Sequence, residues 1–158
     1  MNRSGSVLNF PEPAQCASNV RMIRNQSDDS ARPLIAVVDD DASFLRSIGR
    51  LLCSVGYAVK TFGSAREFLA SLPGSSPQCV VLDIHMPEMT GLELQDWLAE
   101  RGSCVPVILM TAYDTPQTRQ RARQAGGFGF LLKPFDKQAL LNAVAAAVSC
   151  QLPGTPSR

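Results

Sequence analysis

The chain has 158 residues, with 15 lysines and arginines against 14 aspartates and glutamates, which gives a formal net charge of +1. A hydrophobic share of 45% is enough for a packed core and excludes a wholly disordered chain. The near-neutral charge excludes binding to nucleic acid through overall charge alone, and no apolar run reaches the roughly 18 residues that a membrane helix needs.

Strand and helix patterns alternate between Pro33 and Cys150. Short apolar runs, typical of strands buried on both faces, predict strands at 34–38, 57–62, 79–82, 105–110 and 128–132. Apolar residues at helical spacing predict helices at 44–52, 65–72, 91–101 and 136–150, and 115–125 fits a polar, basic helix. This alternation predicts an α/β fold: a doubly wound, five-stranded parallel sheet with helices on both faces.

Two tails flank the domain expected at 33–150. Residues 1–32 are rich in Ser, Asn, Arg and Pro without a sustained period, so we expect a disordered N-terminal tail. Residues 151–158 hold two prolines and a glycine and are expected to be a frayed C-terminal tail. The Pro-Glu-Pro at 11–13 falls where a signal peptide would be apolar.

The cysteines are odd in number and widely scattered, and no pair has the two-residue spacing of a zinc or redox site. They stand at Cys16, Cys53, Cys79, Cys104 and Cys150. We expect buried thiols in a reducing compartment. Together with the absence of a signal peptide, this predicts a cytoplasmic location.

Polar residues follow four of the predicted strands, at the sheet edge where ligands of such folds bind. They are Asp39, Asp40 and Asp41 after the first strand, Asp83 after the third, Thr111 after the fourth and Lys133 after the fifth. Any single aspartate there is commonly a helix cap. Three converging carboxylates, however, repel one another unless a cation neutralises them. A hard divalent cation with oxygen ligands, most economically Mg²⁺, fits this set.

This constellation suits transfer of a phosphoryl group onto a carboxylate. Asp83 is the candidate nucleophile because it stands alone at the end of the central strand, whereas the adjacent Asp39 and Asp40 suit metal binding. The hydroxyl of Thr111 can donate to a phosphoryl oxygen. The ammonium group of Lys133 can contact both the Asp83 carboxylate and an attached phosphoryl group.

The order of these residues resembles the receiver domain of two-component response regulators. The resemblance covers Pro33 to Cys150 and rests on four separated motifs: Asp39-Asp40, Leu82-Asp83-x-x-Met86-Pro87-x-Met89-x-Gly91, Thr111-Ala112 and Lys133-Pro134-Phe135. The residues at 86–92 and 110–114 are similar to receivers of the FixJ/NarL-type group. The fold implied is the flavodoxin-like (βα)5 receiver fold.

The resemblance implies a role for each acidic residue. Asp83 would accept a phosphoryl group from the phosphohistidine of a sensor histidine kinase, or exchange it with a histidine phosphotransfer protein. Asp40, Asp83 and the backbone carbonyl of His85 would bind Mg²⁺, and Asp39 would act through the metal site or its water. Such a domain is a phosphoacceptor and not an enzyme, beyond self-phosphorylation from small donors and autodephosphorylation.

The resemblance also implies a conformational switch. Thr111 and Lys133 would sense the phosphoryl group, and Phe130, three residues before the lysine, would be the aromatic switch residue. Phosphorylation would draw Thr111 inward and let Phe130 follow, which would remodel the surface of the fourth and fifth helices. That surface would bind a downstream target protein or serve a phosphorelay. Homodimerisation on phosphorylation is a further option for it.

Three features depart from the family pattern. Only residues 151–158 follow the domain, too few for a helix-turn-helix, so we expect a stand-alone receiver that contacts neither nucleic acid nor membrane directly. Glycines at 126, 127 and 129 suggest a mobile approach to the last strand. His85 follows the acceptor by two residues, and we hypothesise that His85 and Tyr113 flank the path of the water that hydrolyses the acyl phosphate.

The same residues are also compatible with two other classes of protein. A hydrolase or phosphatase of the haloacid-dehalogenase-like kind is disfavoured, because its nucleophile lies on the first strand and a second aspartate follows where this chain has His85. The alternative is a pseudo-receiver that works as an interaction module without phosphorylation. The intact set of acidic residues, Thr111 and Lys133 argues against that alternative.

Overall fold

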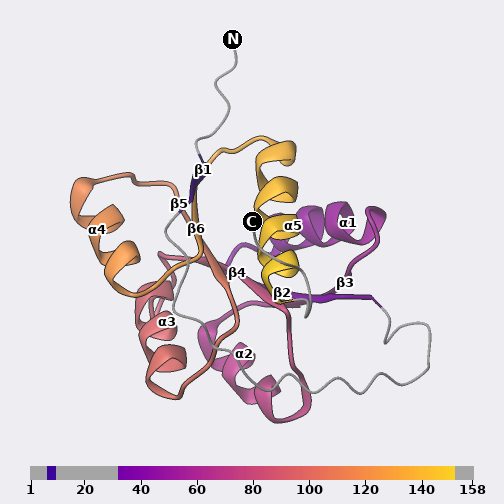
Figure 1. Ribbon diagram of the computed structural model, residues 1–158, viewed down its shortest axis with the longest axis horizontal. Helices are drawn as coiled ribbons and strands as arrows, with labels where there is room; N and C mark the ends of the chain where they lie inside the picture. Colours follow the sequence, from indigo (N-terminus) through magenta and orange to yellow (C-terminus); the bar gives the residue numbers. More distant parts are fainter. Residues whose placement is uncertain (1–6, 10–31, 152–158) are drawn as a thin grey trace.

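The structure is a computed structural model that describes residues 7–9 and 32–151. Its centre is a six-stranded sheet with the order β1-β6-β5-β4-β2-β3 (Figure 1). The strands are β1 (Val7–Asn9), β2 (Leu34–Val38), β3 (Ala58–Phe62), β4 (Cys79–Asp83), β5 (Val107–Thr111) and β6 (Gly129–Leu132). The helices are α1 (Ala42–Ser54), α2 (Ala65–Ser71), the short 3-10 helix η2 (Leu72–Gly74), α3 (Gly91–Glu100), α4 (Pro116–Gln124) and α5 (Lys137–Gln151).

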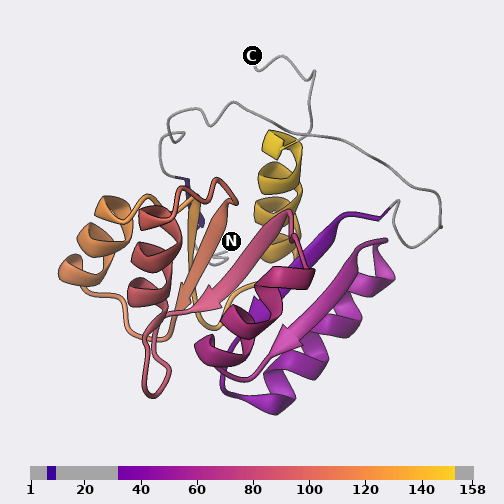
Figure 2. The same cartoon turned by 90° about the horizontal axis from the view of Figure 1, so that it is seen from below.

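Five of the strands, β2 to β6, run parallel, which confirms the predicted α/β sheet (Figure 2). The difference lies at the edge of β6, where β1 pairs antiparallel, with Val7 opposite Leu131 and Asn9 opposite Gly129. The expectation of a structureless N-terminal tail therefore does not hold for Val7–Asn9. The rest of both predicted tails, residues 1–6, 10–31 and 152–158, lies outside the described residues.

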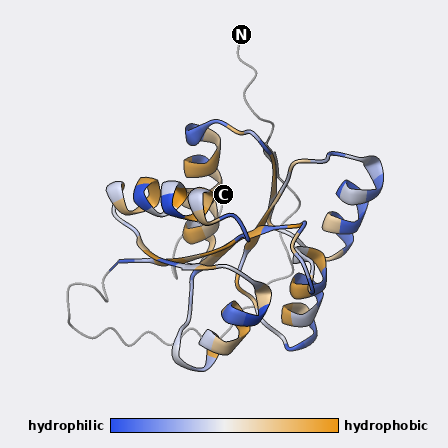
Figure 3. Cartoon of the chain, turned by 180° about the vertical axis from the view of Figure 1, so that it is seen from behind, coloured by the Kyte–Doolittle hydropathy of each residue, from blue (hydrophilic) through white to orange (hydrophobic). Residues whose placement is uncertain are grey.

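Helices cover both faces of the sheet because successive side chains of each strand point to opposite faces. In β2, Ile35 and Val37 pack with α1 and α5, whereas Ala36 and Val38 pack with α2 and α3. Figure 3 shows hydrophobic residues along the strands and hydrophilic residues over much of α4. Among the described residues of α4, only Ala122 is buried, so this helix has little apolar surface to fix it.

Side-chain caps set the starts of the helices that follow the strands. The Asp41 carboxylate accepts hydrogen bonds from the backbone N–H groups of Ser43 and Phe44 at the start of α1. Thr90 and Glu93 form a capping box at the start of α3. Such caps are worth about 1 kcal/mol each and explain why each helix begins directly after a site loop.

Among the described cysteines, the prediction of a buried thiol is right for Cys79 only, and Cys16 lies outside the described residues. Cys53 and Cys150 are exposed, and Cys104 is exposed and disulfide-bonded. Within the described ranges, no helix is long and apolar enough to cross a membrane.

Candidate functional site

Three backbone hydrogen bonds hold the polar residues at the carboxyl edge of the sheet. The N–H of Asp39 donates to Phe62 O at 3.1 Å, and the N–H of Lys133 donates to Thr111 O at 2.7 Å. The N–H of Ile84, directly after Asp83, donates to Met110 O at 2.8 Å. These bonds continue the strand ladders by one residue, so the sheet itself positions the side chains of the site.

An acidic cluster stands at the ends of β2 and β4. Asp39, Asp40 and Asp83 each place a carboxylate oxygen so that the three oxygens lie within 4.8 Å of one another. Asp39 and Asp83 are buried, at 1% and 5% exposure, whereas Asp40 is exposed and opens the cluster to solvent. Asp41 has a different task, since its carboxylate caps α1. An oxygen-only set with one open side fits a hard cation such as Mg²⁺.

Lys133 joins the two buried carboxylates. Its Nζ donates a hydrogen bond to Asp39 Oδ2 at 2.7 Å and lies 3.3 Å from Asp83 Oδ1. Burial lowers the pKa of Lys133, but the hydrogen bond to Asp39 and the charges of both aspartates outweigh that effect and raise it. Lys133 is therefore held as a cation in contact with both buried carboxylates of the cluster.

The ammonium group of Lys133 also lies over an aromatic ring, a contact that was not predicted from the sequence. Its Nζ lies 4.3 Å from the ring centroid of Phe44, and Phe44 packs edge-on against Phe135 with ring centroids 6.1 Å apart. A cation over an aromatic face is attracted by the ring's quadrupole. Phe44 could be recognised only as part of the α1 apolar stripe, because nothing in its spacing points to the lysine.

The surroundings of Asp83 disfavour its ionised form even though Lys133 lies beside it. Burial, and then the charge of Asp39, raise the pKa of Asp83 to about 6, although Lys133 opposes the shift. A single lysine therefore does not balance the cluster of three carboxylates. The donor set and the charge together fit a site that takes up a further positive charge.

Gly91 permits the tight loop that follows Asp83. A Cβ atom at Gly91 would lie 2.3 Å from the backbone oxygen of Asp83, too close for any side chain. The N–H of Gly91 donates to Ile84 O at 2.9 Å, which closes the loop back onto the end of β4. Gly91 belongs to the motif that follows Asp83, but its close approach to the Asp83 backbone depends on how α3 packs against β4 and could not be predicted from the motif.

Thr111 lies at the end of β5 and is fully buried. Its Oγ1 accepts from the N–H of Tyr113 at 3.0 Å, lies 3.2 Å from Tyr113 O and lies 3.3 Å from Nδ1 of His85. The hydroxyl has one proton, so it can donate to Tyr113 O or to Nδ1 of His85 but not to both, and Nδ1 is itself the donor in one of the two imidazole tautomers. The rings of His85 and Tyr113 pack edge-on, with centroids 5.2 Å apart. His85 and Tyr113, the two residues expected to flank the water path, are thus neighbours, and both contact Thr111.

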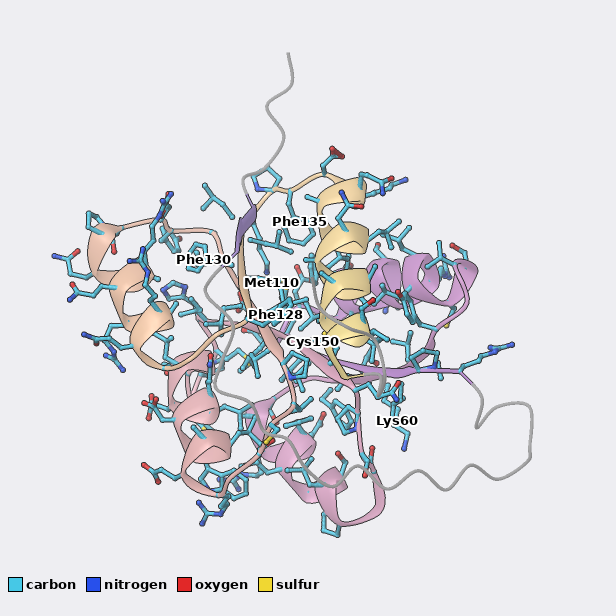
Figure 4. The ribbon with its side chains drawn as sticks, in the orientation of Figure 1. Lys60, Met110, Phe128, Phe130, Phe135 and Cys150 are labelled. Atoms are coloured by element: carbon cyan, nitrogen blue, oxygen red, sulfur yellow. The ribbon has the colours of Figure 1, made fainter. Side chains whose placement is uncertain are left out.

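Phe130 is buried in β6 at 1% exposure. Its side chain packs in the cluster that contains Ala122 of α4, whereas Phe135 packs against the cluster on the α5 side. Figure 4 shows Phe130 toward α4 and Phe135 toward α5. The switch role of Phe130 remains a prediction, and so does the metal-binding role of the His85 carbonyl.

Comparison with known proteins identifies the family. Residues 35–145 match the family described as the response regulator receiver domain. The chain belongs to this family. This receiver is 44% identical over 115 residues to the transcriptional regulatory protein TdiR of Thauera aromatica, covering 73% of this chain and 51% of that protein. It is 36% identical over 123 residues to the transcriptional regulatory protein FixJ of Bradyrhizobium diazoefficiens, covering 78% of this chain and 60% of that protein.

Solved structures give the same family. The receiver is similar to a response regulator receiver protein from Burkholderia phymatum, at 45% identity and a TM-score of 0.68, covering 75% of this chain and 96% of that one. The chain spans about half the length of the curated relative TdiR. The predicted receiver fold is confirmed, and the hydrolase hypothesis is set aside. Receivers are signalling domains of two-component systems that interact with histidine kinases and downstream targets, and they are not conventional enzymes.

Proposed function

We propose that this receiver accepts a phosphoryl group on Asp83 from the phosphohistidine of a sensor histidine kinase or a histidine phosphotransfer protein. The observation that supports this most strongly is the placement of Asp83 itself. Its buried carboxylate lies 3.3 Å from the ammonium group of Lys133 and beside Asp39 and Asp40, at the solvent-facing edge of the sheet. A nucleophile, a fixed cation and a candidate metal site are thus within contact distance of one another.

In the proposed transfer, a carboxylate oxygen of Asp83 attacks the phosphorus atom of the donor. An oxygen–phosphorus bond forms while the phosphorus–nitrogen bond breaks, and the imidazole leaves with that bond's electron pair and takes up a proton. Lys133 is already in place to balance charge on the phosphoryl oxygens, so it need not move during the reaction. Autodephosphorylation is a separate step: water attacks the same phosphorus, the bond between Asp83 oxygen and phosphorus breaks, and inorganic phosphate and the free carboxylate are released.

Asp39, Asp40, Asp83 and the backbone carbonyl of His85 would hold Mg²⁺. When bound, the ion neutralises negative charge on the carboxylates and on the phosphoryl oxygens. The raised pKa of Asp83 supports this assignment, because burial and the nearby Asp39 disfavour its charged form until a further cation is present.

The output of the proposed reaction is a change at α4, β6 and α5. To donate to a phosphoryl oxygen on Asp83, the Thr111 hydroxyl must turn its proton away from Tyr113 O and from Nδ1 of His85. Phe130 would follow into the space that Thr111 leaves. Because α4 has only Ala122 buried among its described residues, its position can respond to such a small change. The remodelled surface would bind a downstream target protein or a phosphorelay partner.

Beryllofluoride, which mimics a phosphoryl group on an aspartate, tests this proposal without a kinase. We expect Mg²⁺ and beryllofluoride together to shift the amide NMR signals of Thr111, Phe130 and Lys133 in the wild type. The Asp83→Asn variant should show no such shifts. Asp41→Asn is the matched control, because asparagine caps a helix as well as aspartate does. An unchanged wild-type spectrum, or equal shifts in Asp83→Asn, would contradict the proposal.

A further inference from the structure

The strand β1 covers an edge of the sheet that would otherwise be open. In the strand order, β6 is paired with β5 on one side and with β1 on the other, so without β1 it would be the edge strand. Figure 1 places β1 beside β6 on the part of the molecule where α4 and α5 also lie. The pairing joins residues far apart in the chain, Val7–Asn9 and Gly129–Leu131.

The bare edge of β6 would favour association. Its sequence, Gly129-Phe130-Leu131-Leu132, contains no charged residue and no proline. Natural edge strands usually carry such residues, because unpaired N–H and C=O groups on an apolar edge are a template for another strand. In this chain the protection comes from β1 and not from residues within β6.

The direction of the peptide groups shows which residue β1 engages. The N–H of Lys133 donates to Thr111 O, so it points toward β5. Peptide groups alternate in direction along a strand, so that of Leu131 points toward β5 as well, and that of Phe130 points the other way. Leu8 is directly opposite Phe130 in the antiparallel register. A residue pair in this geometry exchanges two backbone hydrogen bonds.

We propose that Val7–Asn9 is a built-in edge strand that occupies β6 of its own chain and keeps a second copy of the chain from pairing with the same edge. Two β6 edges can meet antiparallel about a two-fold axis, because such an interface needs only the same surface on each copy. The described strand β1 is three residues long, and a second β6 offers four uncharged residues, so a second copy can compete with β1 for this edge. The inference concerns the same surface as the proposed output but does not require Asp83 to be phosphorylated.

Amide exchange tests the pairing within one strand. In the wild type, the Phe130 amide should be protected by β1 and the Leu131 amide by β5. Leu8→Pro removes the N–H of Leu8 that faces Phe130 and should accelerate exchange at Phe130 by about tenfold or more, with Leu131 unchanged. Ser4→Pro, outside the paired residues, is the matched control and should change neither. Equal exchange at Phe130 in the wild type and Leu8→Pro would overturn the proposal.

The oligomeric state tests the consequence. Light scattering on size-exclusion chromatography should find the wild type and Ser4→Pro monomeric, and Leu8→Pro dimeric in a concentration-dependent way. Deletion of residues 1–9 should act as Leu8→Pro does, which guards against an effect of proline alone. A deletion variant that stays monomeric at every concentration would overturn the proposal. So would a dimeric wild type that the deletion turns into a monomer, because β1 would then pair between chains.

The two proposals fail separately. Phosphoryl labelling of Asp83 should be the same in Leu8→Pro and the wild type, since β1 pairs with β6, whereas the acidic cluster stands at the ends of β2 and β4. Loss of labelling in the wild type would refute the proposed function and leave the edge strand standing. Normal labelling of the wild type, together with a deletion variant that forms no dimer, would refute the edge-strand proposal and leave the proposed function standing.

Discussion

Replacing the proposed phosphoacceptor should make the metal-free protein more stable. Asp83 is buried beside Asp39, and its pKa is raised from 3.8 to about 6. A group whose pKa is raised on folding binds its proton more tightly in the native state, so folding loses stability as pH rises past the unfolded pKa. Asp83→Asn removes the charge while it keeps the shape of the side chain, and therefore removes this loss.

The size of the effect follows from the shift. Each pKa unit corresponds to about 1.36 kcal/mol, so a shift of roughly two units costs about 3 kcal/mol when Asp83 is fully ionised, at about pH 7. At about pH 4.5 the native carboxyl is mostly protonated, and linkage leaves only about 1 kcal/mol of the loss. Asp83→Asn should therefore exceed the wild type by about 3 kcal/mol near neutral pH and by much less in acid.

Urea denaturation followed by circular dichroism measures this difference. The comparison is made with EDTA at both pH values, with Asp41→Asn as the control, which should match the wild type. Added Mg²⁺ should stabilise the wild type and Asp41→Asn but not Asp83→Asn, by about 2.7 kcal/mol when present at a hundredfold excess over its dissociation constant. The reasoning is refuted if Asp83→Asn is no more stable than the wild type in EDTA at neutral pH, or if its advantage is undiminished in acid.

Four further substitutions have defined outcomes. Lys133→Met leaves the two buried carboxylates of Asp39 and Asp83 without their ammonium partner. It should lower the unfolding free energy by ~3 kcal/mol, measured by urea denaturation at neutral pH without metal. An unchanged unfolding free energy would contradict the ion pairs described. Gly91→Ala places a Cβ atom against the backbone oxygen of Asp83 and should lower the unfolding free energy by about 1–3 kcal/mol in the same assay. Phosphoryl labelling of Asp83 should also be slower. Wild-type stability and labelling would show that the loop can relax. His85→Ala and Tyr113→Ala should each shorten the lifetime of the acyl phosphate, followed by mass spectrometry, and rates equal to the wild type would end the hypothesis that these rings flank the water path.

Much of the fold could be predicted because its parallel strands are buried on both faces. The run at 34–38 is apolar throughout for that reason, and helical spacing resumes directly after Asp41. The strand β1 could not be predicted in the same way. Three residues are too few to establish a period, and what stabilises Val7–Asn9 is a distant edge that exists only after the sheet has formed.

The site was predictable at the level of which residues meet, and less so in its contacts. Strand ends in a parallel sheet converge, so the meeting of Asp39, Asp83 and Lys133 followed from their positions after strands. The contact of Lys133 with Phe44 depends on the angle at which α1 crosses the sheet, which no local pattern contains. The closeness of Gly91 to the Asp83 carbonyl likewise depends on how the loop closes.

The most direct measurement of the central claim is phosphoryl transfer from phosphoramidate, a small donor with the phosphorus–nitrogen bond of phosphohistidine. Intact mass should show one added phosphoryl group in the wild type with Mg²⁺, and none in EDTA or in Asp83→Asn. Asp41→Asn should be labelled like the wild type. Labelling of Asp83→Asn, or metal-independent labelling of the wild type, would contradict the assignment of Asp83 as the acceptor in a Mg²⁺ site. A wild type that neither takes the label nor responds to beryllofluoride would contradict phosphoryl acceptance altogether.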